Sequence, residues 1–361
     1  MNANQPNSRD FRLDFAKGIL ILLVIVGHAF FPLYTTDGAH LDIFLYKFIY
    51  SFHMPAFMLL SGYFFYTSNC KPFNKVIVSK LISIGVPFLC FSCAIWLMMQ
   101  MKNFISSDWT SFVGTNNIVY DLCDFLLTSK VMWFLASLLI NCFIVAILSR
   151  ISYGYIGYVL ILIGSLFIPV DHSYIHPGYL FLFPFFLIGY YLKKNNVSLF
   201  WGVGKKYIII LLCCVSILGL YLYNEDTYIY FTGMNVLTDH PLRSMVNNIH
   251  RFIVGVSMCF LFFTTIGYLY FSKYSTSGVV TLIENVGNYT LGIYGFQQVI
   301  FGIIINCFEL FKIEVPASYV MVFASSFFVM CLSYFLTKIC IHFNVLAILF
   351  MGRRIHTSSV R

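Results

Sequence analysis

Long apolar runs separated by short polar segments extend along almost the whole chain. A helix that crosses the ~30 Å hydrocarbon core of a bilayer needs about 20 mainly apolar residues. Ten segments meet this requirement, although the fifth and sixth are short and interrupted by glycine and proline: 15–34, 43–66, 77–100, 131–149, 151–169, 177–192, 206–223, 249–271, 288–309 and 316–340. The pattern predicts an all-α integral membrane protein, a polytopic bundle of about ten transmembrane helices forming a single domain over residues 1–361.

Two further features of the apolar pattern concern the ends of the chain. The last apolar piece, 343–351, is too short to span a bilayer, so it either extends the tenth helix or lies in the membrane interface. The first apolar run ends in Gly27-His28 with no small-x-small site after it, so we do not expect a cleaved signal peptide.

Composition agrees with a membrane protein, because 60% of the residues are hydrophobic and 10% are charged. Soluble domains carry about 25% charged residues. The net charge of +8 is spread over short loops, so we expect no nucleic-acid partner. The eleven cysteines lie mostly inside apolar runs, where a cysteine acts as a small hydrophobic residue.

The distribution of basic residues predicts the orientation of the chain. Sixteen of the 22 Lys and Arg residues fall on the side that holds both termini, which the positive-inside rule assigns to the cytoplasm. The two long loops, 101–130 and 224–248, then face outward. They form either a cap or ligand-binding surface on the outer side, or ordinary connections.

Two histidines occur inside the first two predicted helices, His28 and His53. His28 lies about 20 Å along its helix, and His53 lies about 10–15 Å below the outer face, so both reach a similar depth in adjacent antiparallel helices. An ionisable side chain at that depth indicates function by default. The alternatives are a hydrogen-bonded core histidine and, for His53, a side chain that satisfies a carbonyl freed by Pro55.

The first helix also carries charges near its predicted cytoplasmic end. Lys17 lies about 20° from His28 around the helix, and Asp14 lies about 40° from it on the other side. This face is typical of a channel wall that leads from a charged entrance to a buried base. Positive-inside bias and a helix N-terminal acid explain the same two residues without function.

A cationic stripe leads into the eighth predicted helix from the outer side. Arg243, Asn247 and Arg251 follow each other at intervals of four, which suits an anionic or hydroxyl-rich ligand. Snorkelling and interface anchoring are the alternative. Trp133, Asn141 and Gln297 are further candidates for substrate binding, although buried amides most often join helices.

The motifs around these residues resemble the membrane acyltransferase 3 family of sugar and polysaccharide O-acetyltransferases, in particular its fucose-4-O-acetylase-like branch. The match spans nearly the whole chain. The matching positions are Arg12, Asp14, Lys17-Gly18 and Gly27-His28, then Phe52 to Pro55, Ser61 to Phe64, Trp133 to Leu135 and Thr290 to Tyr294. One position departs from the pattern, because many relatives carry a histidine where this chain has Gln297.

The resemblance implies transfer of an acyl group, usually acetyl, from cytoplasmic acetyl-CoA or another acyl-CoA to a hydroxyl of a cell-surface glycan or lipid-linked sugar. It implies a multi-pass protein of a bacterial inner membrane, surrounded by lipid, with His28 as the general base. His53 and Asp14 would assist catalysis, with His53 orienting the acceptor or stabilising the oxyanion. Arg12 and Lys17 would attract coenzyme A phosphates. Direct transfer is favoured over an acyl-enzyme, for which Ser61 is the nearest candidate.

No metal is expected, because no carboxylate is obviously placed beside the two histidines. The competing interpretation is a proton-coupled secondary transporter or a lipid or sugar flippase, since such carriers also bury histidines. Against it, no inverted repeat is visible and the span centres almost lack Asp and Glu. The acceptor hydroxyl, the acyl group and the formation of a homo-oligomer stay open.

Overall fold

The structure is a computed structural model of the full chain, and it describes residues 10–33, 39–105, 118–128, 131–168, 178–201, 205–271, 277–313 and 318–353. Throughout these ranges the regular elements are helices, in agreement with the predicted all-α class. Their bounds are α1 Phe11–Ala29, α2 Phe44–Asn69, α3 Phe73–Lys80, α4 Val86–Ile105, α6 Ile118–Thr128, α7 Trp133–Leu148, α8 Gly154–Gly164, α9 Gly178–Lys194, α10 Lys206–Tyr221, α11 Ile229–Thr232, α12 Pro241–Phe271, α13 Gly278–Gly287, α14 Thr290–Phe311, α15 Tyr319–His342 and α16 Asn344–Met351. Short 3-10 turns occupy Ala39–Asp42 and Glu225–Thr227, and a π turn, Leu81–Gly85, joins α3 to α4.

Each of the ten predicted segments coincides with a helix, and five helices within the described residues are long and apolar enough to cross a membrane. These five are α2, the α3–α4 helix over 73–102, α12, α14 and α15. The count of ten spans, the single domain and the cytoplasmic termini stay predictions.

Helix ends differ from the predicted spans where local chemistry extends or breaks a helix. α12 begins eight residues before the predicted start, at Pro241, a residue that favours the first helical position because its fixed φ suits a helix. The final apolar piece does not continue α15. Phe343 adopts an extended conformation, and α16 turns back to pack beside α4 and α15.

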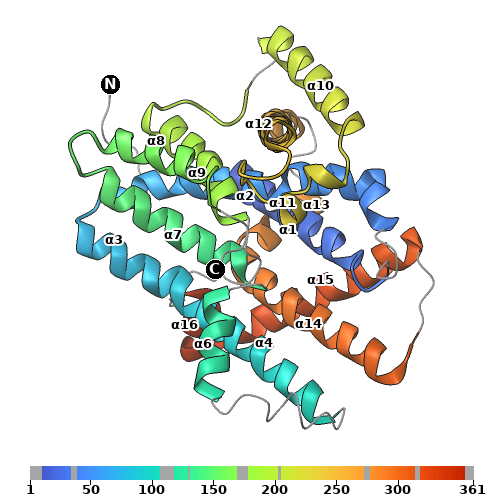
Figure 1. The fold of residues 1–361 in the computed structure, drawn as a ribbon. Coiled ribbons are helices and arrows are strands. Elements are labelled where there is room, and N and C mark those ends of the chain that lie inside the picture. The colour runs from blue at the N-terminus through green and yellow to red at the C-terminus, as the bar shows by residue number, and fades with distance from the viewer. Residues whose placement is uncertain are drawn as a thin grey trace.

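Helices α1 and α2 lie in the middle of the molecule, with α9, α12, α14 and α15 around them, while α10 is peripheral (Figure 1). The most extensive helix pair is α2 with α9, and glycines allow it. A Cβ at Gly62 would overlap the Phe186 carbonyl, and a Cβ at Gly189 would overlap the Leu59 carbonyl. Small residues that let helix backbones approach are the usual means of packing in membranes.

α13 is a short helix outside the predicted spans, and it fixes the charged end of α1. Ser277 caps it by accepting a hydrogen bond from the Val280 N–H. A Cβ at Gly287 would overlap the Asp14 carbonyl oxygen, so the two helices touch backbone to backbone. This contact holds the first turns of α1 in place beneath the site.

Candidate active site

His28 and His53 line one cavity of about 520 Å³ between α1, α2, α4, α7 and α14. We call it the histidine cavity. Its other lining side chains include Tyr46, Tyr50, Met54, Trp133, Tyr294 and Gln298. The two imidazoles that the sequence placed at similar depth therefore face a common space.

A second cavity, of about 210 Å³, lies toward the Lys17 end of α1, and we call it the lysine cavity. Its lining includes Lys17, Ile21, Met54, Ser61, Thr290 and Tyr294. Met54 and Tyr294 line both cavities, so these two side chains form part of the wall between them.

The His28 imidazole is held by an amide from α14. Its Nδ1 lies 3.0 Å from Oε1 of Gln297, and Nε2 of Gln297 donates to the Tyr294 carbonyl at 3.2 Å. Because a carbonyl only accepts, the second bond fixes the amide orientation and directs Oε1 at the ring. Nδ1 of His28 therefore carries the proton, and Nε2 holds the lone pair.

His53 is fixed in the same tautomer by its own helix. Nδ1 donates to the Ile49 carbonyl at 2.6 Å, so its Nε2 is also the unprotonated ring nitrogen. The carbonyl that Pro55 leaves without an N–H partner is that of Ser51, four residues earlier. His53 thus does not fulfil the structural role that its neighbouring proline suggested.

One face of α1 connects the two cavities. Lys17, Ile21 and Val24 line the lysine cavity, and His28, one turn further along the same face, lines the histidine cavity. Ser61, the candidate nucleophile, also lines the lysine cavity, but its hydroxyl donates to the Phe57 carbonyl at 2.8 Å.

The remaining charges of α1 lie away from the histidines. The buried Asp14 carboxylate pairs with Lys17 at 2.7 Å, and at 1.5 Å per residue it is about 21 Å from His28 along the helix. Arg12 forms two bonds to Asp10 at 2.8 and 2.7 Å and stacks over Phe200. Hydrogen bonding to Asp10 raises the pKa of the Arg12 guanidinium, which keeps it charged.

The three other predicted substrate residues have different surroundings. Trp133 lines the histidine cavity from α7. Gln297 is fully buried and is the hydrogen-bond partner of His28, which lines the histidine cavity. Asn141 packs between α7 and α2, where its amide nitrogen lies 3.6 Å from the sulfur of Met58, and it is not among the described lining of either cavity.

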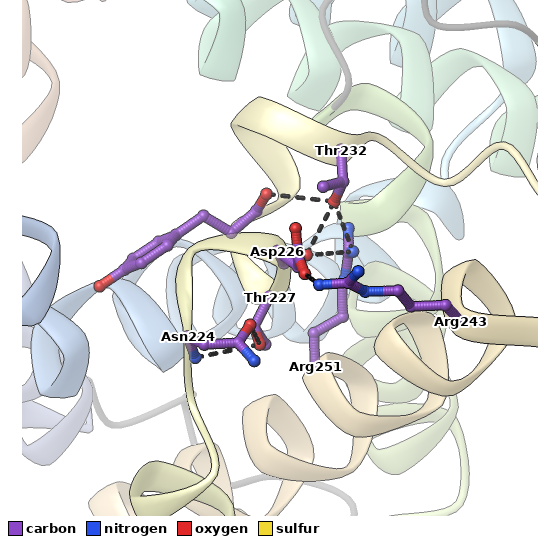
Figure 2. Close-up of polar contacts among 7 residues, drawn as sticks. Asn224, Asp226, Thr227, Thr232, Arg243 and Arg251 are labelled. Carbon is purple, nitrogen blue, oxygen red and sulfur yellow. Dashed lines mark hydrogen bonds and ion pairs between the residues drawn. The ribbon is translucent and has the colours of Figure 1, made fainter. Parts of the chain in front are cut away.

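The two arginines of the α12 stripe, Arg243 and Arg251, contact the segment that precedes α12 (Figure 2). Buried Arg251 donates to the carbonyls of Gly233 and Asp226 and to the Thr232 hydroxyl, at 2.7, 3.3 and 2.8 Å. Arg243 forms an ion pair with the Asp226 carboxylate. Within the described residues, these two arginines and Asn247 are absent from the lining of both cavities.

The segment that Arg251 holds does reach the histidine cavity through Tyr228. The Tyr228 hydroxyl donates to the Leu41 carbonyl at 2.9 Å, and its ring packs 5.7 Å from Tyr46 and 6.4 Å from Tyr50. Both of those tyrosines line the cavity. Part of loop 224–248 thus backs the cavity wall. In loop 101–130, residues 106–117 and 129–130, including Asp108, lie outside the described residues.

Sequence reasoning missed several cavity residues because it treated aromatic and apolar side chains as packing. Tyr46 and Tyr50 precede His53 at intervals of seven and three residues, which places all three on one helix face. That periodicity was available in the sequence, whereas the contact of Met54 with both cavities required coordinates. Among the described residues, no three His, Cys, Asp or Glu side chains gather so as to hold a metal ion.

Comparison with known proteins finds relatives among nodulation proteins. The chain is 29% identical over 237 residues to the nodulation protein NolL of Mesorhizobium japonicum, covering 62% of this chain and 59% of the relative. It is 39% identical over 92 residues to NolL of Sinorhizobium fredii, covering 25% of each protein. The chain thus spans less than two thirds of the length of either relative. No solved structure matches.

The family comparison covers most of the chain. The sequence model described as an acyltransferase domain matches residues 10–337, which include every helix that lines the two cavities. Proteins of this family are membrane proteins, consistent with the five long apolar helices. The chain belongs to the acyltransferase 3 family.

Proposed function

We propose that this protein transfers an acyl group, most simply acetyl, from cytoplasmic acyl-CoA to a hydroxyl of a cell-surface glycan or lipid-linked sugar. His28 acts as the general base. One observation carries the proposal: His28 and His53 face a common cavity with Nδ1 of each ring engaged as a donor.

The role of His28 follows from its hydrogen bond to Gln297. A general base needs an unprotonated nitrogen directed at the attacking hydroxyl, and an imidazole titrates near neutral pH, so it can both accept and return a proton. With Nδ1 donating to the amide, Nε2 is the basic atom. The amide also fixes the ring orientation, as a carbonyl or carboxylate partner does for many functional histidines.

His53 suits the second role, orienting the acceptor. Its Nδ1 donates to the Ile49 carbonyl, which leaves neutral His53 with an acceptor at Nε2 and no donor for an oxyanion. A sugar presents neighbouring hydroxyls, so one can donate to Nε2 of His53 while another donates to Nε2 of His28. This arrangement would position the reacting oxygen.

The acyl donor would enter through the lysine cavity. Its lining is mainly apolar and suits the pantetheine arm, while Lys17 supplies a positive charge for phosphate or for a polar group of the arm. The orientation expected from the basic residues puts this end of α1 in the cytoplasm, where acyl-CoA is made. Arg12 would contribute to the positive potential near the entrance.

The reaction then balances without an acyl-enzyme. The acceptor oxygen attacks the thioester carbonyl carbon and gives its proton to Nε2 of His28. The carbonyl π electrons move to oxygen and form a tetrahedral oxyanion. Collapse of this intermediate breaks the carbon–sulfur bond, the coenzyme A thiolate takes the proton from the imidazolium, and an ester remains on the sugar.

The test compares glycans from cells that carry the wild-type gene, a deletion or a single substitution. We expect His28→Ala to abolish one ester-linked acyl group, detected by mass spectrometry, with the protein level unchanged. His250→Ala is the matched control, because Nε2 of His250 also donates to a neighbouring helix, at the Gly219 carbonyl, yet His250 lies outside the described lining of both cavities. Identical glycans from wild-type and His28→Ala cells would refute the assignment of the base.

A further inference from the structure

Tyr294 of α14 stands where the two cavities meet. Its side chain lines the histidine cavity and the lysine cavity. If donor and acceptor approach from opposite ends, as the proposed function requires, the thioester carbonyl and the attacking hydroxyl meet beside this ring. No other polar side chain among the described residues lines both spaces.

The Tyr294 hydroxyl is buried and forms no hydrogen bond of standard geometry within the described structure, although the Gln298 side chain and the Phe134 backbone lie near it. The whole residue is 6% exposed. A buried hydroxyl left without a partner is costly, so such groups are uncommon unless they serve another purpose. An unpaired donor at the junction of two cavities is suited to a partner that arrives with the substrate.

Tyr294 is also coupled to the proposed base. The Tyr294 carbonyl accepts from Nε2 of Gln297, whose Oε1 accepts from Nδ1 of His28. Two hydrogen bonds therefore connect the backbone of the tyrosine to the imidazole. The ring itself packs against Phe134, with centroids 5.9 Å apart. This support gives the phenol and the base a fixed relation, which oxyanion stabilisation requires.

We propose that the Tyr294 hydroxyl donates a hydrogen bond to the thioester carbonyl oxygen and strengthens it as that oxygen becomes the oxyanion. The inference rests on the proposed acyl transfer. Tyr294 keeps its proton throughout: the hydroxyl proton of the acceptor goes to His28 and then to the thiolate, while the carbon–oxygen bond forms and the carbon–sulfur bond breaks. His53 cannot serve in this place while neutral, because its only ring N–H is bonded to Ile49.

The experiment uses the full-length protein in cells and compares Tyr294→Phe with Tyr158→Phe. Tyr158 of α8 is the matched control, since its hydroxyl is likewise buried and unpartnered among the described residues but lines neither cavity. The rate of acylation is followed by mass spectrometry of glycans after a pulse of isotopically labelled acetate. Binding of acetyl-CoA to each purified variant in detergent is measured in parallel.

Loss of a single oxyanion donor lowers turnover about 10²- to 10³-fold. We expect this loss in Tyr294→Phe, with acetyl-CoA binding within about twofold of wild type, and an unchanged rate in Tyr158→Phe. A Tyr294→Phe rate above one third of wild type, or equal losses of rate and acetyl-CoA binding, would overturn the inference. If wild-type and deletion cells carry the same acyl groups, the proposed function fails and the inference fails with it.

Discussion

The hydrogen bond between Gln297 and His28 allows a direct test of how the proposed base is oriented. Gln297→Leu keeps most of the side-chain volume and removes the acceptor that lies 3.0 Å from Nδ1. The imidazole then loses its fixed partner and can rotate or take the other tautomer, with the proton on Nε2. In that tautomer the atom facing the acceptor hydroxyl cannot accept its proton.

The size of the effect follows from burial. Gln297 is fully buried, so water does not readily replace the amide. A buried donor left unsatisfied costs about 1–3 kcal/mol. If this free energy destabilises the ring orientation needed for catalysis, kcat/KM falls roughly 5- to 150-fold, because about 1.4 kcal/mol corresponds to a tenfold change in rate.

Gln297→His is the informative companion variant, because an imidazole can again offer an unprotonated nitrogen to Nδ1 of His28. Initial rates of ester formation are compared with protein abundance for wild type, Gln297→Leu and Gln297→His. We expect the histidine variant to retain at least several times the rate of the leucine variant. A leucine variant at the wild-type rate, or a histidine variant as impaired as leucine, would refute the reasoning.

Three further predictions concern the support of the site. Gly62→Ala should prevent normal folding, because the added Cβ would overlap the Phe186 carbonyl. Gly164 faces open space, so Gly164→Ala should elute from size-exclusion chromatography like wild type. Equal elution of the two variants would contradict the packing of α2 against α9. Arg251→Gln should lower the free energy of unfolding in detergent by about 1–3 kcal/mol for each hydrogen-bond acceptor that is left unpaired. The equivalent change at exposed Arg243 should cost about 0–1 kcal/mol, and a larger loss at Arg243 would be inconsistent with these contacts. Lys17→Met should raise KM for acetyl-CoA about tenfold and leave kcat little changed, because it removes one charged hydrogen bond of ~1.5 kcal/mol. A fall in kcat with an unchanged KM would contradict a role of Lys17 in donor binding.

The apolar pattern predicted the helices well because the bilayer imposes a length and a composition on each span. All ten predicted segments coincide with helices. The short helix α13 escaped prediction, since ten residues of mixed polarity carry no membrane signal. The sequence also did not predict the break between α15 and α16, because the extended residue there is Phe343 and no Pro or Gly marks the position.

For the candidate site, the sequence identified residue types and depth but not partners. The cost of burying an imidazole pointed to His28 and His53, which line one cavity. The contact of Gln297 with His28 joins residues 269 positions apart, and no local pattern encodes such a distance. For Arg251, periodicity predicted a residue that faces a ligand, whereas its guanidinium binds backbone carbonyls. Spacing along a helix does not distinguish these two environments.

The wall that Met54 and Tyr294 share has a consequence for the energetics of the cell. An open aqueous pore from the cytoplasm to the outer face would let ions flow and discharge the proton-motive force. In the proposed transfer, the donor and the acceptor occupy the two cavities that Met54 and Tyr294 separate, and the acyl group alone would change sides. The acyl group would then cross the bilayer as its thioester bond is exchanged for an ester bond, and no ions would flow with it.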